Sequence, residues 1–289
     1  MKLAIFHYHL NRGGVTRVIE NQLLALDAVL DPADPWTVAV VYGGRREGWN
    51  DALGSRLQAV RLSLVEVPPL DYDSEVPAFA PPGSDHLFDT VSSSLEEQGF
   101  TPKETLLHVH NHALGKNRAW PGALWRLAEA GYVALLQIHD FAEDFRPKNY
   151  LRLLEAIDGE PSRLYPQAPG IHYAVLNDRD HAILKEAGVA TDHLHLVPNP
   201  APPMDGLPPA GMARAKLHEH FGVKTDECFV LYPVRCIRRK NVGEALLHAA
   251  LAPSGTVVGL TLAPLNPAET PIYRMWKELA VELKLPCRF

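Results

Sequence analysis

Apolar residues recur with two different periods along the first two thirds of the chain, and the two periods alternate. Short β-prone apolar runs predict strands, and between them apolar residues recur at helical spacing, as at Val15, Ile19 and Leu23. The expected strands span residues 2–9, 36–42, 62–67, 106–110, 133–139, 173–176 and 195–197, and the expected helices include 85–98, 121–130 and 180–187. Strands that alternate with helices are typical of a parallel, doubly wound sheet. The sequence therefore predicts an α/β fold.

A proline-rich segment at residues 198–211 interrupts this pattern. Its prolines favour extended backbone and block helix formation, so we expect a linker there, between a first domain at 1–200 and a second at 201–289. The second domain is predicted to hold helices at about 212–221, from 241 onward and around 273–283, with strands at 229–234 and 256–263. So small a sheet leaves apolar faces without partners, and we expect this domain to be incomplete in the chain.

Composition narrows the class of protein. The chain has 289 residues, 46% of them hydrophobic, and a net charge of −6, which argues against general nucleic-acid binding. No apolar run approaches the roughly 20 residues that span a bilayer, although peripheral membrane contact stays open. The N-terminus is predicted to be a first strand and not a signal peptide. Cys228, Cys236 and Cys287 lack metal-ligand spacing and suit reduced thiols, so we expect a cytoplasmic protein.

The segment 229–241, FVLYPVRCIRRKN, places two cations between a predicted strand and a predicted helix. Open α/β sheets bind ligands at the carboxyl ends of their strands, where Arg235 and Lys240 are expected. A guanidinium and an ammonium group beside a helix N-terminus suit a diphosphate. An ordinary solvated basic loop is the alternative at this point.

Gly13 and Gly14 occupy the turn between the first strand and the first helix. Glycines let the backbone approach a ligand closely, and the N–H groups at the start of a helix can hold an anion. The alternative is a tight turn that requires positive φ. A full G-x-G-x-x-G motif is absent, so the sequence does not support a Rossmann dinucleotide site.

Histidines gather where several predicted strands end. His108, His110 and His112 alternate along the chain, so an extended backbone would place them on one face. His139 ends the next strand, and histidines 7 and 9 end the first, so up to five imidazoles are expected to line one cleft. Three interpretations stay open: a zinc site, substrate contacts or acid–base chemistry by His139, and hydrogen-bonded histidines without a chemical role.

Two Asp-x-Asp patterns, at 71–73 and 178–180, match a motif that holds divalent cations in some nucleotide-sugar enzymes. The first lies in a proline-rich loop. The second is typical of a helix start, where Asn177 or Asp178 can act as the cap. We therefore expect no metal site at either.

Taken in order, four segments resemble those of the GT-B glycosyltransferases, and among these the retaining glycosyltransferase family 4. Residues 13–17, GGVTR, resemble the glycine-rich loop of that family. Residues 173–188, YAVLNDRDHAILKEAG, resemble the segment where a strand leads into a helix late in the first domain.

The other two segments depart from the family pattern at single positions. Residues 195–200, HLVPNP, resemble the hinge motif V-I-P-N-G, with Pro200 in place of the glycine. Residues 234–241, VRCIRRKN, resemble G-R-x-x-x-x-K-G, with Val234 and Asn241 in place of the glycines.

The resemblance implies a GT-B architecture, with two doubly wound, Rossmann-like domains: the first on the acceptor side and the second, incomplete, binding the nucleotide sugar. The implied reaction is transfer of a hexose from a nucleotide-diphosphate sugar to a hydroxyl acceptor, with retention of configuration. Arg235 and Lys240 correspond to the residues that bind the donor diphosphate, and Gly13 and Gly14 correspond to a loop that lies by the donor phosphates and the acceptor. His139 takes the position of a histidine near the transferred sugar, and is the expected catalytic residue.

Further residues are expected on the substrate and acceptor side: His110, Asn111, His112, Asn177 and Asn199. The acceptor class stays open between a sugar, a glycerate-like compound and a lipid-linked molecule. Such enzymes generally need no bound metal or other cofactor, which implies none here.

One departure concerns a Glu-x₇-Glu motif that contacts the donor sugar and ribose in this family. The chain reaches Phe289 before that motif, so we expect the parent protein to be a transferase and this chain to be inactive. Two other functions stay open: a metal-dependent hydrolase built on His108, His110 and His112, and a carbohydrate- or nucleotide-binding module without turnover.

Overall fold

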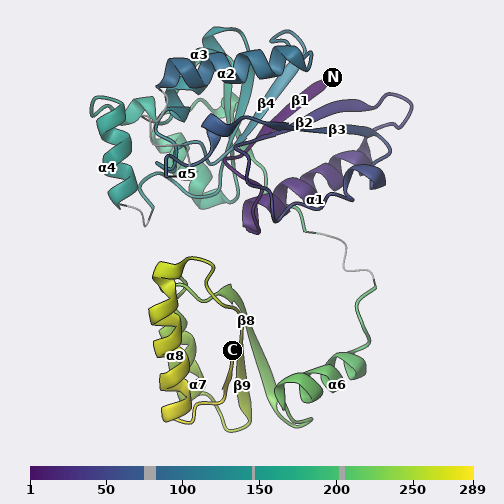
Figure 1. Cartoon of the computed structure of the whole chain (residues 1–289), viewed down its shortest axis with the longest axis vertical. Helices are drawn as coiled ribbons and strands as arrows, with labels where there is room; N and C mark the ends of the chain where they lie inside the picture. Colours follow the sequence, from purple (N-terminus) through teal and green to yellow (C-terminus); the bar gives the residue numbers. More distant parts are fainter. Residues whose placement is uncertain (75–82, 145–146, 202–205) are drawn as a thin grey trace. The chain divides into compact units, whose positions relative to one another are not determined.

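The computed structural model describes residues 1–74, 83–144, 147–201 and 206–289. The chain divides into two compact units, Met1–Pro202 and Pro203–Phe289 (Figure 1). Part of the expected linker, residues 202–205, lies outside the described residues.

The first unit contains a seven-stranded sheet whose strands are ordered β3-β2-β1-β4-β5-β6-β7 and are all parallel. The strands are β1 (Lys2–Phe6), β2 (Trp36–Tyr42), β3 (Val60–Glu66), β4 (Thr105–His110), β5 (Val133–Ile138), β6 (Ile171–Val175) and β7 (Leu194–Leu196). The central strands are buried on both faces, which explains their continuous apolar runs. The predicted α/β alternation is confirmed.

Helices cover the two faces of this sheet (Figure 1). They are α1 (Gly14–Val29), α2 (Ser84–Glu97), α3 (Trp120–Glu129), α4 (Pro147–Ala156) and α5 (Asp178–Glu186). The apolar side of α1, with Ile19 and Leu23, packs on one face, and Trp120 of α3 packs on the other, 5.4 Å from the ring of Phe6. Two separate cores therefore fix the sheet between its helices, so that its strand ends are held in place.

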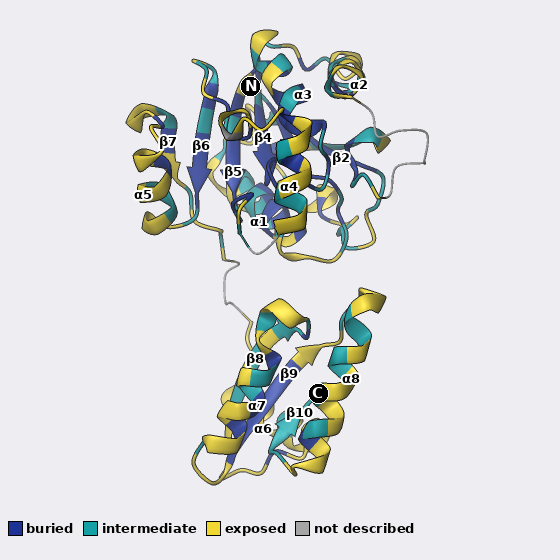
Figure 2. Ribbon diagram, turned by 90° about the vertical axis from the view of Figure 1, so that its left-hand side faces the viewer, coloured by how far each residue is buried: buried dark blue, intermediate teal, exposed yellow. Residues whose placement is uncertain are grey.

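The second unit contains a three-stranded parallel sheet, ordered β10-β9-β8. Its elements are α6 (Ala210–Phe221), β8 (Cys228–Arg235), α7 (Val242–Leu251), β9 (Thr256–Leu262), α8 (Thr270–Glu282) and β10 (Cys287–Arg288). Figure 2 shows β9 as the buried strand of this sheet. Leu246, Leu260 and Ala280 lie in its core, so α7 and α8 pack on the same side. The sequence did not predict β10.

Among the described residues, no helix combines the length and the apolar character that crossing a membrane requires.

Candidate functional site

The strand order reverses direction between β1 and β4. From β1 the chain proceeds to β2 and β3 on one side, and from β4 it proceeds to β5, β6 and β7 on the other. Ligands of open α/β sheets bind at such a switch point, outside the carboxyl ends of the strands. The loops that follow β1 and β4 therefore frame the first candidate site, and they contain the glycine pair and the histidines.

Gly13 and Gly14 begin α1 without adopting positive φ. Gly13 is extended, with φ −170° and ψ 172°, and Gly14 is the first residue of the helix. The alternative of a tight turn with positive φ is therefore wrong. A Cβ added at Gly14 would meet nothing within 4 Å, and no side chain caps the helix. The start of α1 thus has both the space and the uncapped N–H groups that an anion requires.

Neighbouring residues hold this glycine loop in place, and sequence reasoning missed them. Thr16 Oγ1 donates to the carbonyl of Asn11 at 2.7 Å. The backbone N–H of Gly48, in the loop after β2, donates to the carbonyl of Leu10 at 3.0 Å. A Cβ at Gly48 would lie 2.1 Å from the backbone nitrogen of Arg12. Only glycine allows this approach, so the loop after β2 supports the glycine loop.

Four imidazoles cluster at the same edge, from three neighbouring strands. His108 and His110 belong to β4, His7 follows β1 and His139 follows β5. His110 Nδ1 lies 2.9 Å from His139 Nε2, and His108 Nε2 lies 2.8 Å from Oε1 of Gln137. His7, His108 and His110 are buried, whereas His139 is only partly buried. The predicted convergence of histidines is therefore observed for these four.

Burial keeps the rings of this cluster neutral. It lowers the pKa of His7 to about 3 and the pKa values of His108 and His139 to about 4. Burial also lowers the pKa of His110 well below its usual value, and the neighbouring imidazoles lower it further. Near pH 7 these groups can donate and accept hydrogen bonds, but they supply no positive charge for a leaving group.

His112 does not share the face of His108 and His110, which corrects the sequence expectation. Asn111 has φ 56°, in the left-handed region, and this reverses the direction of the next side chain. His112 is fully buried beside Tyr173 in the opposite core, and its Nε2 donates to the carbonyl of Leu164 at 2.8 Å. A direct contact between His112 and an acceptor would require this packing to open.

Asn111 itself is a centre of hydrogen bonds. Its Oδ1 accepts from the backbone N–H groups of His139 at 2.7 Å and Asp140 at 3.2 Å. Its carbonyl accepts from the hydroxyl of Tyr8 at 2.8 Å. Asn111 is buried, so it joins the ends of β4 and β5 and the segment after β1.

The two asparagines expected near the acceptor lie elsewhere in this unit. Asn177 is the N-cap of α5, and its Oδ1 accepts from the backbone N–H of Asp180 at 2.9 Å. Asn199 is exposed in the segment after β7. The structure gives Asn177 a capping role, and acceptor contacts for both residues stay predictions.

The first Asp-x-Asp pattern is occupied by ion pairs. Arg45 Nε donates to Asp71 Oδ2 at 2.6 Å, and Arg118 Nε donates to Asp73 Oδ2 at 2.9 Å. Across the part of the chain that the structure describes, no group of three or more His, Cys, Asp or Glu side chains is placed to hold a metal ion. The metal-dependent hydrolase therefore has no ligand set among these residues.

In the second unit, the two cations flank the turn from β8 to α7. Arg235 is the last residue of β8, and Lys240 ends the short 3₁₀ helix Arg238–Lys240. The hydroxyl of Tyr232 donates to the carbonyl of Lys240 at 2.7 Å. Asn241, which replaces a glycine of the resembled motif, has φ 50° and is the N-cap residue of α7. It thus adopts the conformation for which glycine is the usual residue.

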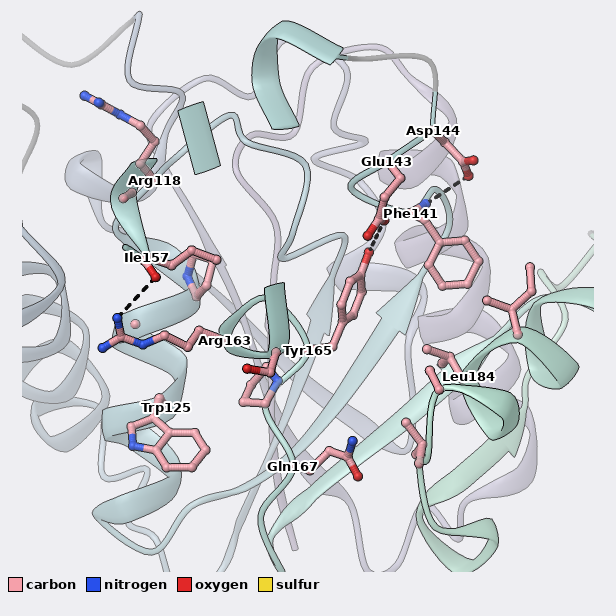
Figure 3. A pocket seen from close by; sticks show the side chains of 18 of the residues that line it. Arg118, Trp125, Phe141, Glu143, Asp144, Ile157, Arg163, Tyr165, Gln167 and Leu184 are labelled. Atoms are coloured by element: carbon pink, nitrogen blue, oxygen red, sulfur yellow. Dashed lines mark hydrogen bonds between the residues drawn. The ribbon is translucent and has the colours of Figure 1, made fainter. Parts of the chain in front are cut away.

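A cavity of about 1070 Å³ opens within the first unit between α3, α5 and the segment that precedes β6. Figure 3 shows Trp125, Gln167 and Tyr165 among the residues that line it. The hydroxyl of Tyr165 donates to Oε2 of Glu143 at 3.0 Å. None of the residues predicted for the site lines this cavity. Its lining combines aromatic and apolar side chains with the arginines 118, 126, 163 and 179.

Comparison with known proteins gives one curated relative and several solved structures. No protein-family model matches the chain. The chain is 26% identical over 287 residues to a mannosylglucosyl-3-phosphoglycerate synthase from Petrotoga mobilis. That alignment covers 96% of the chain and 53% of the relative, so the chain spans about half the length of the relative.

The solved structures are more distant in sequence. HepE from Anabaena, solved in complex with UDP-glucose, has a TM-score of 0.62 at 13% identity, covering 100% of this chain and 68% of HepE. WaaG, a glycosyltransferase of lipopolysaccharide biosynthesis, has a TM-score of 0.55 at 14% identity, covering 99% of this chain and 69% of WaaG. A UDP-GlcNAc 2-epimerase from Neisseria meningitidis has a TM-score of 0.50 at 13% identity, covering 96% of this chain and 70% of the epimerase.

The chain therefore has the α/β fold of the GT-B type, as the sequence resemblance implies. Because an epimerase is also among the similar structures, the fold alone does not decide the reaction.

Proposed function

We propose that this chain contributes to a glycosyltransferase that moves a hexose from a nucleotide-diphosphate sugar to a hydroxyl acceptor. The observation that carries the proposal is the similarity to a mannosylglucosyl-3-phosphoglycerate synthase along 96% of the chain. That similarity supports glycosyl transfer over epimerisation. The name of that relative also supports an acceptor of the class that it implies, a glycoside of a phosphorylated glycerate.

In the proposed reaction, the bond between the anomeric carbon and the donor diphosphate breaks, and a bond to the acceptor oxygen forms. The proton of the acceptor hydroxyl passes to the leaving diphosphate, and attack on the same face retains the configuration, as in family 4. We assign stabilisation of the leaving diphosphate to Arg235 and Lys240. Their position where β8 ends, beside the start of α7, supports this role.

We assign contacts with the transferred sugar to His139 and an anion-binding role to the Gly13–Gly14 loop. His139 is the partly exposed member of the imidazole cluster, and the loop has the space that a phosphate requires. The proposal includes independence of bound metal and a cytoplasmic location, the latter supported by the three free cysteines.

The first test is the binding of UDP, GDP, ADP and their sugar conjugates to this chain, followed as a rise in the thermal unfolding midpoint. A ligand at about one hundred times its dissociation constant adds about 2.7 kcal/mol of stability. We expect the nucleotides of one base to raise the thermal unfolding midpoint, both with and without EDTA. A rise that requires Mg²⁺ would remove metal independence, and no rise with any nucleotide would contradict the donor site.

The second test is Arg235→Ala, with calorimetry of the nucleotide diphosphate that binds. Loss of a charge-assisted hydrogen bond costs about 1.5–3 kcal/mol, so we expect the affinity to fall about 10- to 100-fold. Arg274→Ala, which removes an exposed arginine from α8, is the control and should leave the affinity unchanged. Equal affinities for the two variants would remove Arg235 from the site. Product analysis with and without a phosphoglycerate glycoside then separates transfer from epimerisation.

A further inference from the structure

The imidazole of His139 is held from two directions by residues at the end of β4. Its Nε2 lies 2.9 Å from Nδ1 of His110, and its backbone N–H donates to Oδ1 of Asn111 at 2.7 Å. Asn111 is in turn fixed by the hydroxyl of Tyr8, which donates to its carbonyl at 2.8 Å. Both the backbone and one ring nitrogen of His139 are therefore constrained.

The proton between the two rings can be assigned from what each arrangement leaves unpaired. Nε2 of His110 is buried and has no hydrogen-bond partner among the described residues. If His139 donated the shared proton, a neutral His110 would carry its own proton on Nε2 and bury an unpaired N–H. If His110 Nδ1 donates, Nε2 is left as a bare lone pair. Buried unpaired N–H groups are the rarer and more costly case.

His110 therefore donates to His139, and Nε2 of His139 is the acceptor. A neutral His139 must then carry its proton on Nδ1. That nitrogen is absent from the buried unpaired atoms, and no partner holds it among the described residues, so it is open to solvent.

We propose that His110 and Asn111 are positioning residues that hold His139 as its Nδ1–H tautomer, so that a neutral ring presents an N–H donor from the end of β5. The recipient of that hydrogen bond, a hydroxyl or ring oxygen of the transferred sugar, rests on the proposed function. The tautomer does not depend on it.

Two other buried rings have the same arrangement, which supports the assignment. His112 donates from Nε2 to the carbonyl of Leu164, and its Nδ1 has no partner. His7 is hydrogen-bonded to the backbone of His110, and its Nδ1 likewise has no partner. In each ring one N–H is paired and the other nitrogen is a bare acceptor.

Neutrality matters for the proposed role. Because burial lowers the pKa of His139 to about 4, the ring remains uncharged through the physiological range. An uncharged N–H donor orients a sugar oxygen without placing a positive charge beside it.

The direct test is long-range ¹H–¹⁵N correlation spectroscopy of the ¹⁵N-histidine-labelled chain at pH 7.5, with the signals of His139 assigned by their loss in His139→Gln. We expect a protonated, pyrrole-type Nδ1 and an unprotonated, pyridine-type Nε2. The opposite pattern, or fast exchange between both tautomers, would overturn the proposal. This measurement requires no variant of the positioning residues.

Two variants of His110 separate positioning from packing. His110→Leu removes the donor, and His139 should then lose the fixed Nδ1–H pattern. His110→Asn places an amide N–H near the former Nδ1 position and should restore that pattern. An unchanged His139 spectrum in His110→Leu would overturn the role of His110.

The kinetics of sugar transfer then test whether the Nδ1–H group of His139 takes part in the reaction. We expect His110→Leu to lower kcat about tenfold with little change in the KM of the nucleotide sugar, and His110→Asn to recover most of that loss. If the tautomer is fixed in the unsubstituted protein but kcat is the same in His110→Leu, then His110 has a structural role alone and its positioning role in transfer is contradicted. Absence of transfer by the glycosyltransferase to which we propose that this chain contributes, with every nucleotide sugar tested and with the Nδ1–H pattern present, would reject the proposed function and leave the tautomer assignment standing.

Discussion

The candidate residues of the two units are held by the fold in different ways. At the carboxyl edge of the first sheet, the imidazoles of His7, His108 and His110 are buried and hydrogen-bonded to neighbouring strands. At the turn from β8 to α7, Arg235 and Lys240 are only partly buried, and the turn is fixed by the hydroxyl of Tyr232, which donates to the backbone carbonyl of Lys240.

This difference determines which perturbation affects which site. In the first unit, packing sets the protonation state of the candidate residues, so pH and core substitutions should change them. In the second unit, the charge of the guanidinium is permanent, and what the fold must supply is its position. Backbone geometry, and not pH, should therefore control the second site.

The largest expected effect is an acid-induced loss of stability in the first unit. Burial lowers the pKa values of His7, His108 and His112 to between about 3 and about 4, below the unfolded value of 6.5. The unfolded chain therefore binds protons first as the pH falls. The stabilisation is complete above about pH 6.5 and is lost as the pH falls toward the folded values.

Each such imidazole loses about 1.4 kcal/mol of stabilisation per pH unit within this window. For three of them we expect the unfolding midpoint of the first unit to fall by about 10 °C between pH 6.5 and 5.5. Thermal unfolding followed by circular dichroism measures it. His112→Gln keeps a donor for the carbonyl of Leu164 but cannot titrate, so its stability should fall less steeply with acid. An equal slope would mean that His112 is not buried in its neutral form.

The next effect concerns the support of the glycine loop. In Gly48→Ala the new Cβ would lie 2.1 Å from the backbone nitrogen of Arg12, so the two loops must separate. Such overpacking costs about 1–3 kcal/mol. We expect a lower unfolding midpoint and weaker binding of the nucleotide diphosphate. Gly54→Ala is the matched control, because its Cβ would meet nothing within 4 Å. Equal behaviour of the two variants would show that the loops do not depend on each other.

The sequence predicted those features that follow from strand order alone. Continuous apolar runs identified the strands because helices cover both faces of the sheet, and parallel strands brought His110 and His139 to one edge. Helix α4 was missed, although Tyr150, Leu153 and Ile157 recur at helical spacing, because the pattern is short and charged residues precede it.

Other features depend on contacts that no local pattern encodes. The reversal at Asn111, which sends His112 into the opposite core, depends on hydrogen bonds to residues far along the chain. The role of Gly48 arises from its approach to Arg12, which lies in a different loop. Sequence reasoning therefore located the edge of the sheet where the candidates lie, but not the direction in which each side chain points.

The smallest effect tests the second site through its backbone. Asn241 has φ 50°, which asparagine tolerates and β-branched residues do not. Asn241→Gly restores the glycine of the resembled motif and should change the affinity for the nucleotide diphosphate less than about threefold, because glycine adopts this conformation freely. Asn241→Val should strain the turn by about 1–3 kcal/mol and displace Lys240.

Calorimetry at pH 7.5 and pH 6 measures the affinity of these variants for the nucleotide diphosphate and tests whether it depends on backbone position or on pH. If backbone position controls the second site, Asn241→Val weakens binding by a similar factor at both pH values, and Asn241→Gly stays close to the parent chain. If Asn241→Gly instead loses as much affinity as Arg235→Ala, the asparagine amide itself contacts the ligand. The asparagine in place of the glycine of the resembled motif would then be a change in donor recognition and not a tolerated substitution in a turn.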